Sequence, residues 1–167
     1  ARAAWWLAIP ISASLGAGAL AQQPSASGSS PQVHQAEVAG AAGISAQMKA
    51  GESTYQTVCL ACHQADGKGL PGAFPPLAGS DYLLGDKDRA VGVVVRGLEG
   101  EVVVNGVKYN SVMPAMTQLS DQEIADALTY AMNSWGNKGG AVSVAQVTAV
   151  RAKAAAEAAN DAVASVE

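Results

Sequence analysis

The five residues Cys59-Leu60-Ala61-Cys62-His63 decide how this chain is interpreted. Two cysteines that are separated by two residues and followed directly by histidine have the spacing of c-type haem attachment. On one helical turn, both thiols can reach the vinyl groups of one porphyrin, and the imidazole of His63 can bind the iron. The motif therefore predicts one covalent haem c, attached through Cys59 and Cys62, with His63 as an axial ligand.

The two thiols have three alternative interpretations, namely a redox-active dithiol, a simple disulfide and half of a zinc site. Cys59 and Cys62 are the only cysteines among the 167 residues. A thioredoxin-like dithiol follows a strand, whereas this motif follows a predicted helix. A zinc site needs two further ligands, and the one other histidine, His34, lies in a polar segment. The haem interpretation is therefore favoured.

The composition is typical of one small domain with tails. Hydrophobic residues make up 49% of the chain, aromatic residues 5% and charged residues 14%, and the formal net charge is −4. A domain with so little aromatic bulk benefits from a buried porphyrin in its core. The sequence has no run of Lys or Arg, so we expect no nucleic-acid partner.

The first 21 residues predict a secretory signal peptide or an anchor. Arg2 precedes an apolar run that starts at Trp5, and Ala19-Leu20-Ala21 is a small-residue cleavage pattern. Cleavage after Ala21 is favoured, because residues 5–21 are short for a membrane span. We therefore expect a periplasmic protein, attached to the membrane only if residues 5–21 are retained.

The remainder divides into three parts. Residues 22–45 are rich in Gln, Pro, Ser, Gly and Ala and predict a flexible linker. A folded domain is predicted over residues 46–138, and a helical tail over residues 139–167, which is either docked, frayed or available for an interaction.

The local patterns within the folded domain predict helices and one hairpin. Asp86 is a cap for a helix over 86–97, and Asn105-Gly106 between β-branched runs predicts a type I′ hairpin over 101–109. Ser120 and Glu123 form a capping box for a helix that ends at Gly136-Asn137. Further helices are predicted over about 45–61 and 143–165. The fold class is therefore all-α with a short β-hairpin.

Two methionines are candidates for a second iron ligand. A His/Met pair stabilises ferrous iron and raises the reduction potential. Met113 and Met116 both lie in a loop between the hairpin and the capped helix, and Pro114 stiffens the backbone next to Met113. Met113 is therefore the predicted ligand and Met116 the alternative. The remaining interpretation is that both methionines fill gaps in the core.

The order of these features along the chain, over roughly residues 47–137, resembles that of the class I cytochromes c. The resemblance implies the class I cytochrome c fold, here with the hairpin as an insertion and an extra C-terminal helix, so that residues 46–138 form a cytochrome c domain. It also implies that Gly51 and Tyr55 of the first helix pack against Tyr130 of the last core helix. In this family a proline carbonyl accepts the Nδ1–H of the haem-binding histidine, and Pro76 matches that position.

A narrower likeness concerns residues 69–78, 107–114 and 133–137. These segments are similar to haem domains that accompany periplasmic oxidoreductases, especially the haem c domain fused to some copper nitrite reductases. The chain itself has no second cluster of His and Cys for copper, so nitrite chemistry would belong to a partner. Tyr109 lies in the second segment and is expected at the haem, whereas Arg96 is expected either to neutralise a propionate or to lie on the surface.

Together these features predict an electron carrier and not an enzyme. The expected partners are redox proteins, namely a periplasmic dehydrogenase, reductase or oxidase, with copper nitrite reductase as one candidate. The alternatives are an electron-transfer subunit tethered to a dehydrogenase or reductase complex, and a five-coordinate, peroxidase-like haem enzyme if neither loop methionine binds iron.

Overall fold

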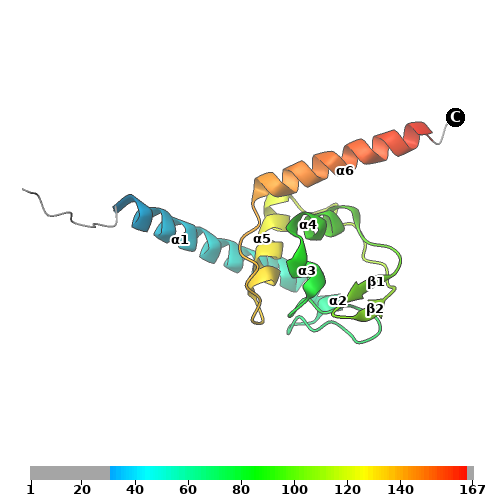
Figure 1. Cartoon of the computed structure of the whole chain (residues 1–167), viewed down its shortest axis with the longest axis horizontal. Helices are drawn as coiled ribbons and strands as arrows, with labels where there is room; N and C mark the ends of the chain where they lie inside the picture. The colour runs from blue at the N-terminus through cyan, green and yellow to red at the C-terminus, as the bar shows by residue number, and fades with distance from the viewer. Residues whose placement is uncertain (1–30, 165–167) are drawn as a thin grey trace, which may run out of the picture.

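The described part of the chain is mostly helical, with one two-stranded antiparallel sheet (Figure 1). The structure, a computed structural model, describes residues 31–164, with side chains from residue 43 onward. The predicted signal peptide or anchor at 1–21 and the first part of the predicted linker lie outside the described residues. In chain order the elements are α1 (Pro31–Thr54), the π-helical turn η1 (Tyr55–Cys59), α2 (Leu60–His63), α3 (Asp81–Gly85), α4 (Lys87–Arg96), β1 (Val102–Val104), β2 (Val107–Tyr109), α5 (Asp121–Asn133) and α6 (Val144–Ala164).

The predicted linker over residues 22–45 is wrong from Pro31 onward, because α1 begins there. Proline is favoured at the first position of a helix, where its missing N–H costs no hydrogen bond. Residues 32–45 contain no further proline and are rich in Ala, Gln and Val, so the helix continues to the haem motif.

Helices α1 and α5 cross in close contact at Gly51. A Cβ atom at Gly51 would lie 2.0 Å from the carbonyl oxygen of Asp126, so only glycine fits at this crossing. One turn later the ring of Tyr55 lies 5.4 Å from that of Tyr130 and 5.2 Å from that of Trp135, centroid to centroid. The packing of Gly51 and Tyr55 against Tyr130 is therefore confirmed.

The hairpin and the helix before it form as predicted. The Asp86 carboxylate accepts a hydrogen bond from the Arg89 amide and caps α4. Asn105 and Gly106 have φ angles of 51° and 78°, as a type I′ turn requires, and Val104 pairs with Val107 across it. The short helix α3, capped by Ser80, was not predicted, since five residues are too few for a periodic pattern.

Helix α5 begins at the predicted capping box and ends earlier than predicted. The Ser120 hydroxyl accepts from the Glu123 amide, and the Glu123 carboxylate accepts from the Ser120 amide. The helix ends at Asn133 rather than at Gly136-Asn137, and Trp135 takes a positive φ of 53°. The turn after α5 therefore carries Trp135 back toward the haem motif.

The tail helix α6 is docked over its first half and extends beyond the core over its second half (Figure 1). Val147 is fully buried, and Val150 and Ala154 pack against the core. Residues 155–164 are exposed. None of the helices between residues 31 and 164 is long and apolar enough to cross a membrane.

Candidate functional site

The Cys-x-x-Cys-His motif lies where the long first helix passes through a π-helical turn. Cys59 is the last residue of η1, and Cys62 and His63 belong to α2. A π-helical turn shifts the residues after it around the helix axis and is common at functional sites. Here both thiols and the His63 ring line one cavity, and the two cysteines are not joined by a disulfide. This part of the chain therefore presents two free thiols and an imidazole to one space.

The surroundings of Cys59 do not suit a redox-active dithiol. Burial and, to a smaller extent, the neighbouring Cys62 raise the pKa of the Cys59 thiol to about 11. A reactive dithiol needs a lowered thiol pKa, because the thiolate is the nucleophile. Among the residues that the structure describes, no group of three or more His, Cys, Asp or Glu side chains could hold a metal ion.

His63 is oriented by a proline carbonyl, but not by the predicted one. Its Nδ1 lies 3.1 Å from the carbonyl oxygen of Pro75, whereas Pro76 was predicted. An Nδ1–H that donates to this carbonyl leaves Nε2 free to bind a metal and holds the ring in one orientation. Burial lowers the pKa of His63, and the bond to Pro75 opposes that effect.

The register of the loop between the motif and α3 explains the difference. Leu70 and Phe74 pair as an isolated bridge, and the amides of Leu77 and Ala78 both donate to the Gly67 carbonyl at 2.7 and 2.9 Å. In this register the carbonyl of Pro75 faces the histidine, and Pro76 contributes to the cavity wall. Two consecutive prolines look alike in the sequence, so only the loop register distinguishes them.

The cavity is lined largely by apolar side chains of residues between Tyr55 and Ala131. Helix α5 contributes one row of apolar wall residues with helical spacing, and α4 contributes a second row. The hairpin and the proline-rich loop close it. The wall residues from these elements are Ile124, Ala127, Leu128 and Ala131; Ala90, Val93 and Val94; Val102, Val104 and Tyr109; and Phe74, Pro75, Pro76 and Leu77.

The methionine loop, defined here as residues 113–119, forms a further wall. Met113 and Met116 both line the cavity. The backbone of Met113 is held to Leu98 by a pair of hydrogen bonds of 2.8 and 2.9 Å, and Gly97, with φ of 79°, permits this close approach. The sulfur of Met116 accepts a hydrogen bond from Gln118 at 3.6 Å. The backbone of Met116 is also held, by a hydrogen bond from its amide to the Val94 carbonyl at 2.9 Å. The two residues therefore differ in their side chains, because the Met116 thioether already accepts from Gln118.

Of the two remaining predicted contacts, Tyr109 lies at the cavity and Arg96 does not. Tyr109 is buried at the end of β2 and lines the cavity. Arg96 lies on the other face of α4, where its guanidinium packs over Gly92 and lies 4.0 Å from the Glu157 carboxylate of α6. Of the two positions expected for Arg96, the structure has the one on the surface, because α4 turns its Ala90, Val93 and Val94 face to the cavity.

Sequence reasoning missed two side chains that support the site. Asn137 is buried, and its amide joins the end of α5 to the loop after the prolines through bonds to Gly79, Leu77 and Ala131 of 2.8 to 2.9 Å. Arg89 stacks on Tyr82, a wall residue, with 4.1 Å between the guanidinium carbon and the ring centroid. The sequence signal for Asn137 was its position after Gly136, which predicted only a helix end.

Arg89 also carries an unsatisfied polar atom beside the wall. One of its terminal nitrogens donates to the Tyr82 carbonyl at 2.6 Å, and its buried Nε has no hydrogen-bond partner among the described residues.

An apolar cavity whose wall contains two thiols, an imidazole nitrogen that is free to bind a metal, and thioethers fits a covalent haem held by His and Met. The residues present therefore suit the predicted group.

The domain that contains this site is similar to several known proteins. The family model described as cytochrome c oxidase, cbb3-type, subunit III, matches residues 46–130, about half of the chain. Cytochrome c-552 of Thermus thermophilus is 45% identical over 83 residues, which are 47% of this chain and 63% of that protein. The cytochrome c subunit of the quinone alcohol dehydrogenase of Gluconacetobacter polyoxogenes is 37% identical over 105 residues, 60% of this chain and 22% of that subunit.

A third relative is the gluconate 2-dehydrogenase cytochrome c subunit of Pantoea cypripedii, 35% identical over 92 residues, which are 52% of this chain and 20% of that subunit. The chain thus spans less than two thirds of the length of the Thermus thermophilus protein and about a fifth of these dehydrogenase subunits.

Proposed function

Because the chain belongs to the family of cytochrome c domains described as cytochrome c oxidase, cbb3-type, subunit III, and is a monohaem class I cytochrome c, we propose that it carries single electrons between redox partners. Family membership confirms the prediction of covalent haem c. When bound, that group supplies one-electron exchange between ferric and ferrous iron.

The observation that carries the proposal is that the oriented His63 ring and the backbone-anchored Met113 line the same apolar cavity. Pro75 holds the Nδ1 of His63, a residue of the cavity wall, and this leaves Nε2 free to bind the iron. The two bonds to Leu98 hold Met113 at the cavity wall. Burial by the apolar walls keeps water from the site and favours the less charged ferrous state. These contacts support a His63/Met113 pair in a class I fold whose additions are the hairpin and α6.

An optical spectrum of the oxidised holoprotein tests the ligand pair. We expect a thioether-to-ferric-iron band in the far red, which Met113→Ala removes and the matched variant Met116→Ala retains. Loss of the band in Met116→Ala alone would assign the ligand to Met116. A wild-type protein with a high-spin ferric spectrum and no such band would contradict the electron-carrier function and favour the five-coordinate, peroxidase-like alternative.

The partner surface is proposed at the apolar rim of the cavity. Val112 and Pro114 line the cavity and are exposed, with Val112 62% exposed. Ser111 donates to the Ala73 carbonyl at 2.6 Å and thereby joins this rim to the exposed loop that contains Leu70. Small apolar surfaces of this kind suit transient electron-transfer encounters.

The second candidate function is an electron-transfer subunit within a dehydrogenase complex. Two of the relatives are described as cytochrome c subunits of dehydrogenases, and this supports a periplasmic dehydrogenase as the donor. Copper nitrite reductase as a redox partner remains a prediction. Stopped-flow reduction by a quinone alcohol dehydrogenase and by a gluconate dehydrogenase, compared with oxidation by a copper nitrite reductase, distinguishes these partners. An observed rate constant for reduction that saturates at micromolar dehydrogenase would support the complex.

A further inference from the structure

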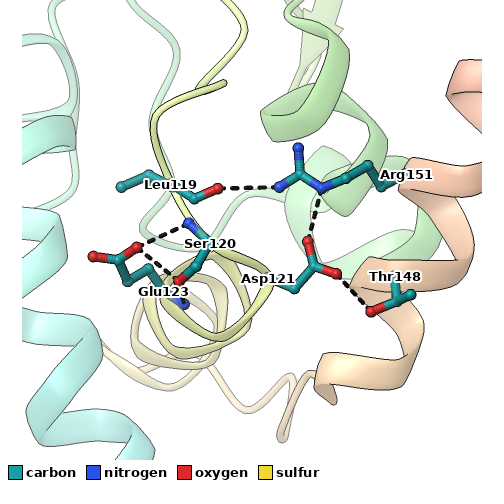
Figure 2. A network of polar contacts seen from close by, with 6 residues as sticks. All are labelled: Leu119, Ser120, Asp121, Glu123, Thr148 and Arg151. Atoms are coloured by element: carbon teal, nitrogen blue, oxygen red, sulfur yellow. Dashed lines mark hydrogen bonds and ion pairs between the residues drawn. The ribbon is translucent and has the colours of Figure 1, made fainter.

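Helix α6 lies outside the residues that the family model matches, and yet it contacts the loop that carries the proposed iron ligand. The family match ends at residue 130, and α6 spans Val144–Ala164. Its first half packs on α4 and α5 through the buried Val147. Two of its polar side chains, Thr148 and Arg151, face the N-terminus of α5 (Figure 2).

Arg151 makes the central contacts of this network. Its Nε donates to the Asp121 carboxylate at 2.7 Å, and its Nη2 donates to the Leu119 carbonyl at 3.1 Å (Figure 2). The hydroxyl of Thr148 donates to the other oxygen of the same carboxylate at 2.5 Å. The Arg151 side chain is 35% exposed and that of Asp121 25% exposed, so these charge-assisted bonds are partly shielded from water.

The carbonyl that Arg151 binds belongs to the C-terminal end of the methionine loop. The Leu119 side chain is buried and lines the cavity. Its amide donates to the Met116 carbonyl at 3.2 Å, and the Met116 amide donates to the Val94 carbonyl at 2.9 Å. The loop is therefore anchored at Met113 by Leu98, in the middle by Val94, and at its end by Arg151.

We propose that Arg151 is a positioning residue for the methionine loop, through which α6 strengthens the binding of the loop thioether to the haem iron. This inference rests on the proposed His63/Met113 ligation. The Leu119 carbonyl lies one residue before the Ser120 cap of α5, whose own carbonyl accepts from the Ile124 amide at 3.0 Å. Without Arg151 the Leu119 carbonyl has no partner from α6, and the end of the loop can move away from the cavity more readily.

Competition by imidazole for the iron measures how readily the loop opens. The far-red band is followed as imidazole is added to the oxidised holoprotein, well below the unfolding temperature. We expect Arg151→Ala to bind imidazole about tenfold more tightly, because a hydrogen bond to a charged group is worth about that factor in an equilibrium. Arg151→Lys retains the charge and lacks the planar fork that reaches both acceptors, so we expect it to bind imidazole more tightly than wild type as well.

Two controls separate this role from general docking of α6. Glu157→Gln breaks the ion pair between α6 and Arg96 of α4, at 4.0 Å, and the pair with Lys153 within α6, at 3.9 Å. Neither pair involves the methionine loop. We expect this variant to bind imidazole as wild type does. Amide hydrogen exchange gives a second readout, in which Arg151→Ala accelerates exchange at Met116 and Leu119 and Glu157→Gln does not.

The outcomes are distinct. A wild-type protein without the far-red band overturns the proposed ligation, and this inference with it. A wild-type protein with the band, and an Arg151→Ala variant with unchanged imidazole affinity and unchanged exchange at Met116, overturns the positioning role alone. An equal effect of Glu157→Gln also overturns it, because any loosening of α6 would then suffice.

Discussion

Replacing Gly51 with alanine tests whether α1 and α5 are in direct backbone contact where they cross. A Cβ atom at this position would lie 2.0 Å from the Asp126 carbonyl oxygen and 2.9 Å from the Tyr130 Cβ. Both neighbours belong to the backbone or the rigid start of a side chain, so no change of rotamer relieves the overlap. The helices would have to separate until the closest distance reached at least 3.4 Å, the ordinary contact range.

Two destabilising effects and one stabilising effect set the size of the expected change in the free energy of unfolding. Overpacking that displaces backbone costs up to about 3 kcal/mol. Separation of the helices also loosens the rings of Tyr55, Tyr130 and Trp135, whose contacts are worth about 1 kcal/mol. The higher helix propensity of alanine returns about 1 kcal/mol. We therefore expect Gly51→Ala to lower the free energy of unfolding by about 3 kcal/mol.

Urea unfolding of the oxidised holoprotein, followed by far-ultraviolet circular dichroism, measures the change. The matched control is Gly43→Ala in the same helix, where a Cβ would meet nothing within 4 Å. We expect the control to be unchanged or more stable by up to about 1 kcal/mol. If Gly51→Ala unfolds within about 0.5 kcal/mol of wild type, the helices do not touch as described and the reasoning is refuted.

Two further predictions concern polar contacts. Asn137→Ala should lower the free energy of unfolding by about 2–4 kcal/mol, because it removes one buried and two part-buried hydrogen bonds and leaves their backbone partners unpaired. The exposed Asn160→Ala is the control in the same urea assay, and equal stability of the two variants would contradict this. Hydrogen bonds from Thr148 and then Arg151 hold the pKa of Asp121 below its usual range. The ionised carboxylate therefore stabilises the folded state above the ordinary carboxyl pKa of about 3.9, and this contribution is lost as the pH falls through the lowered value. The difference in stability between wild type and Asp121→Asn should thus shrink below about pH 4, and a difference that stays constant down to pH 2.5 would exclude the mechanism.

Local chemistry explains which elements could be predicted. The caps at Asp86 and Ser120 and the turn at Asn105-Gly106 form from neighbours in the chain, and all three are confirmed. The start of α1 was missed because the low apolar periodicity of residues 31–45 resembles that of a linker, although their backbone propensity favours a helix. The end of α5 was placed too late because Trp135 continues its apolar pattern, while its ring packs on Gly67 in the loop after the motif.

The sequence by itself determined the cofactor, because Cys59, Cys62 and His63 are adjacent and covalent attachment depends only on that local spacing. It also determined the two methionine candidates. Only the tertiary structure decided between residues that the sequence presents as equals. The loop register selects Pro75 over Pro76, the rotation of α4 turns Arg96 away from the cavity, and the docking of α6 brings Arg151 to Leu119. These contacts join residues far apart in the chain, and their geometry depends on how helices pack, for which a single sequence contains no local signal.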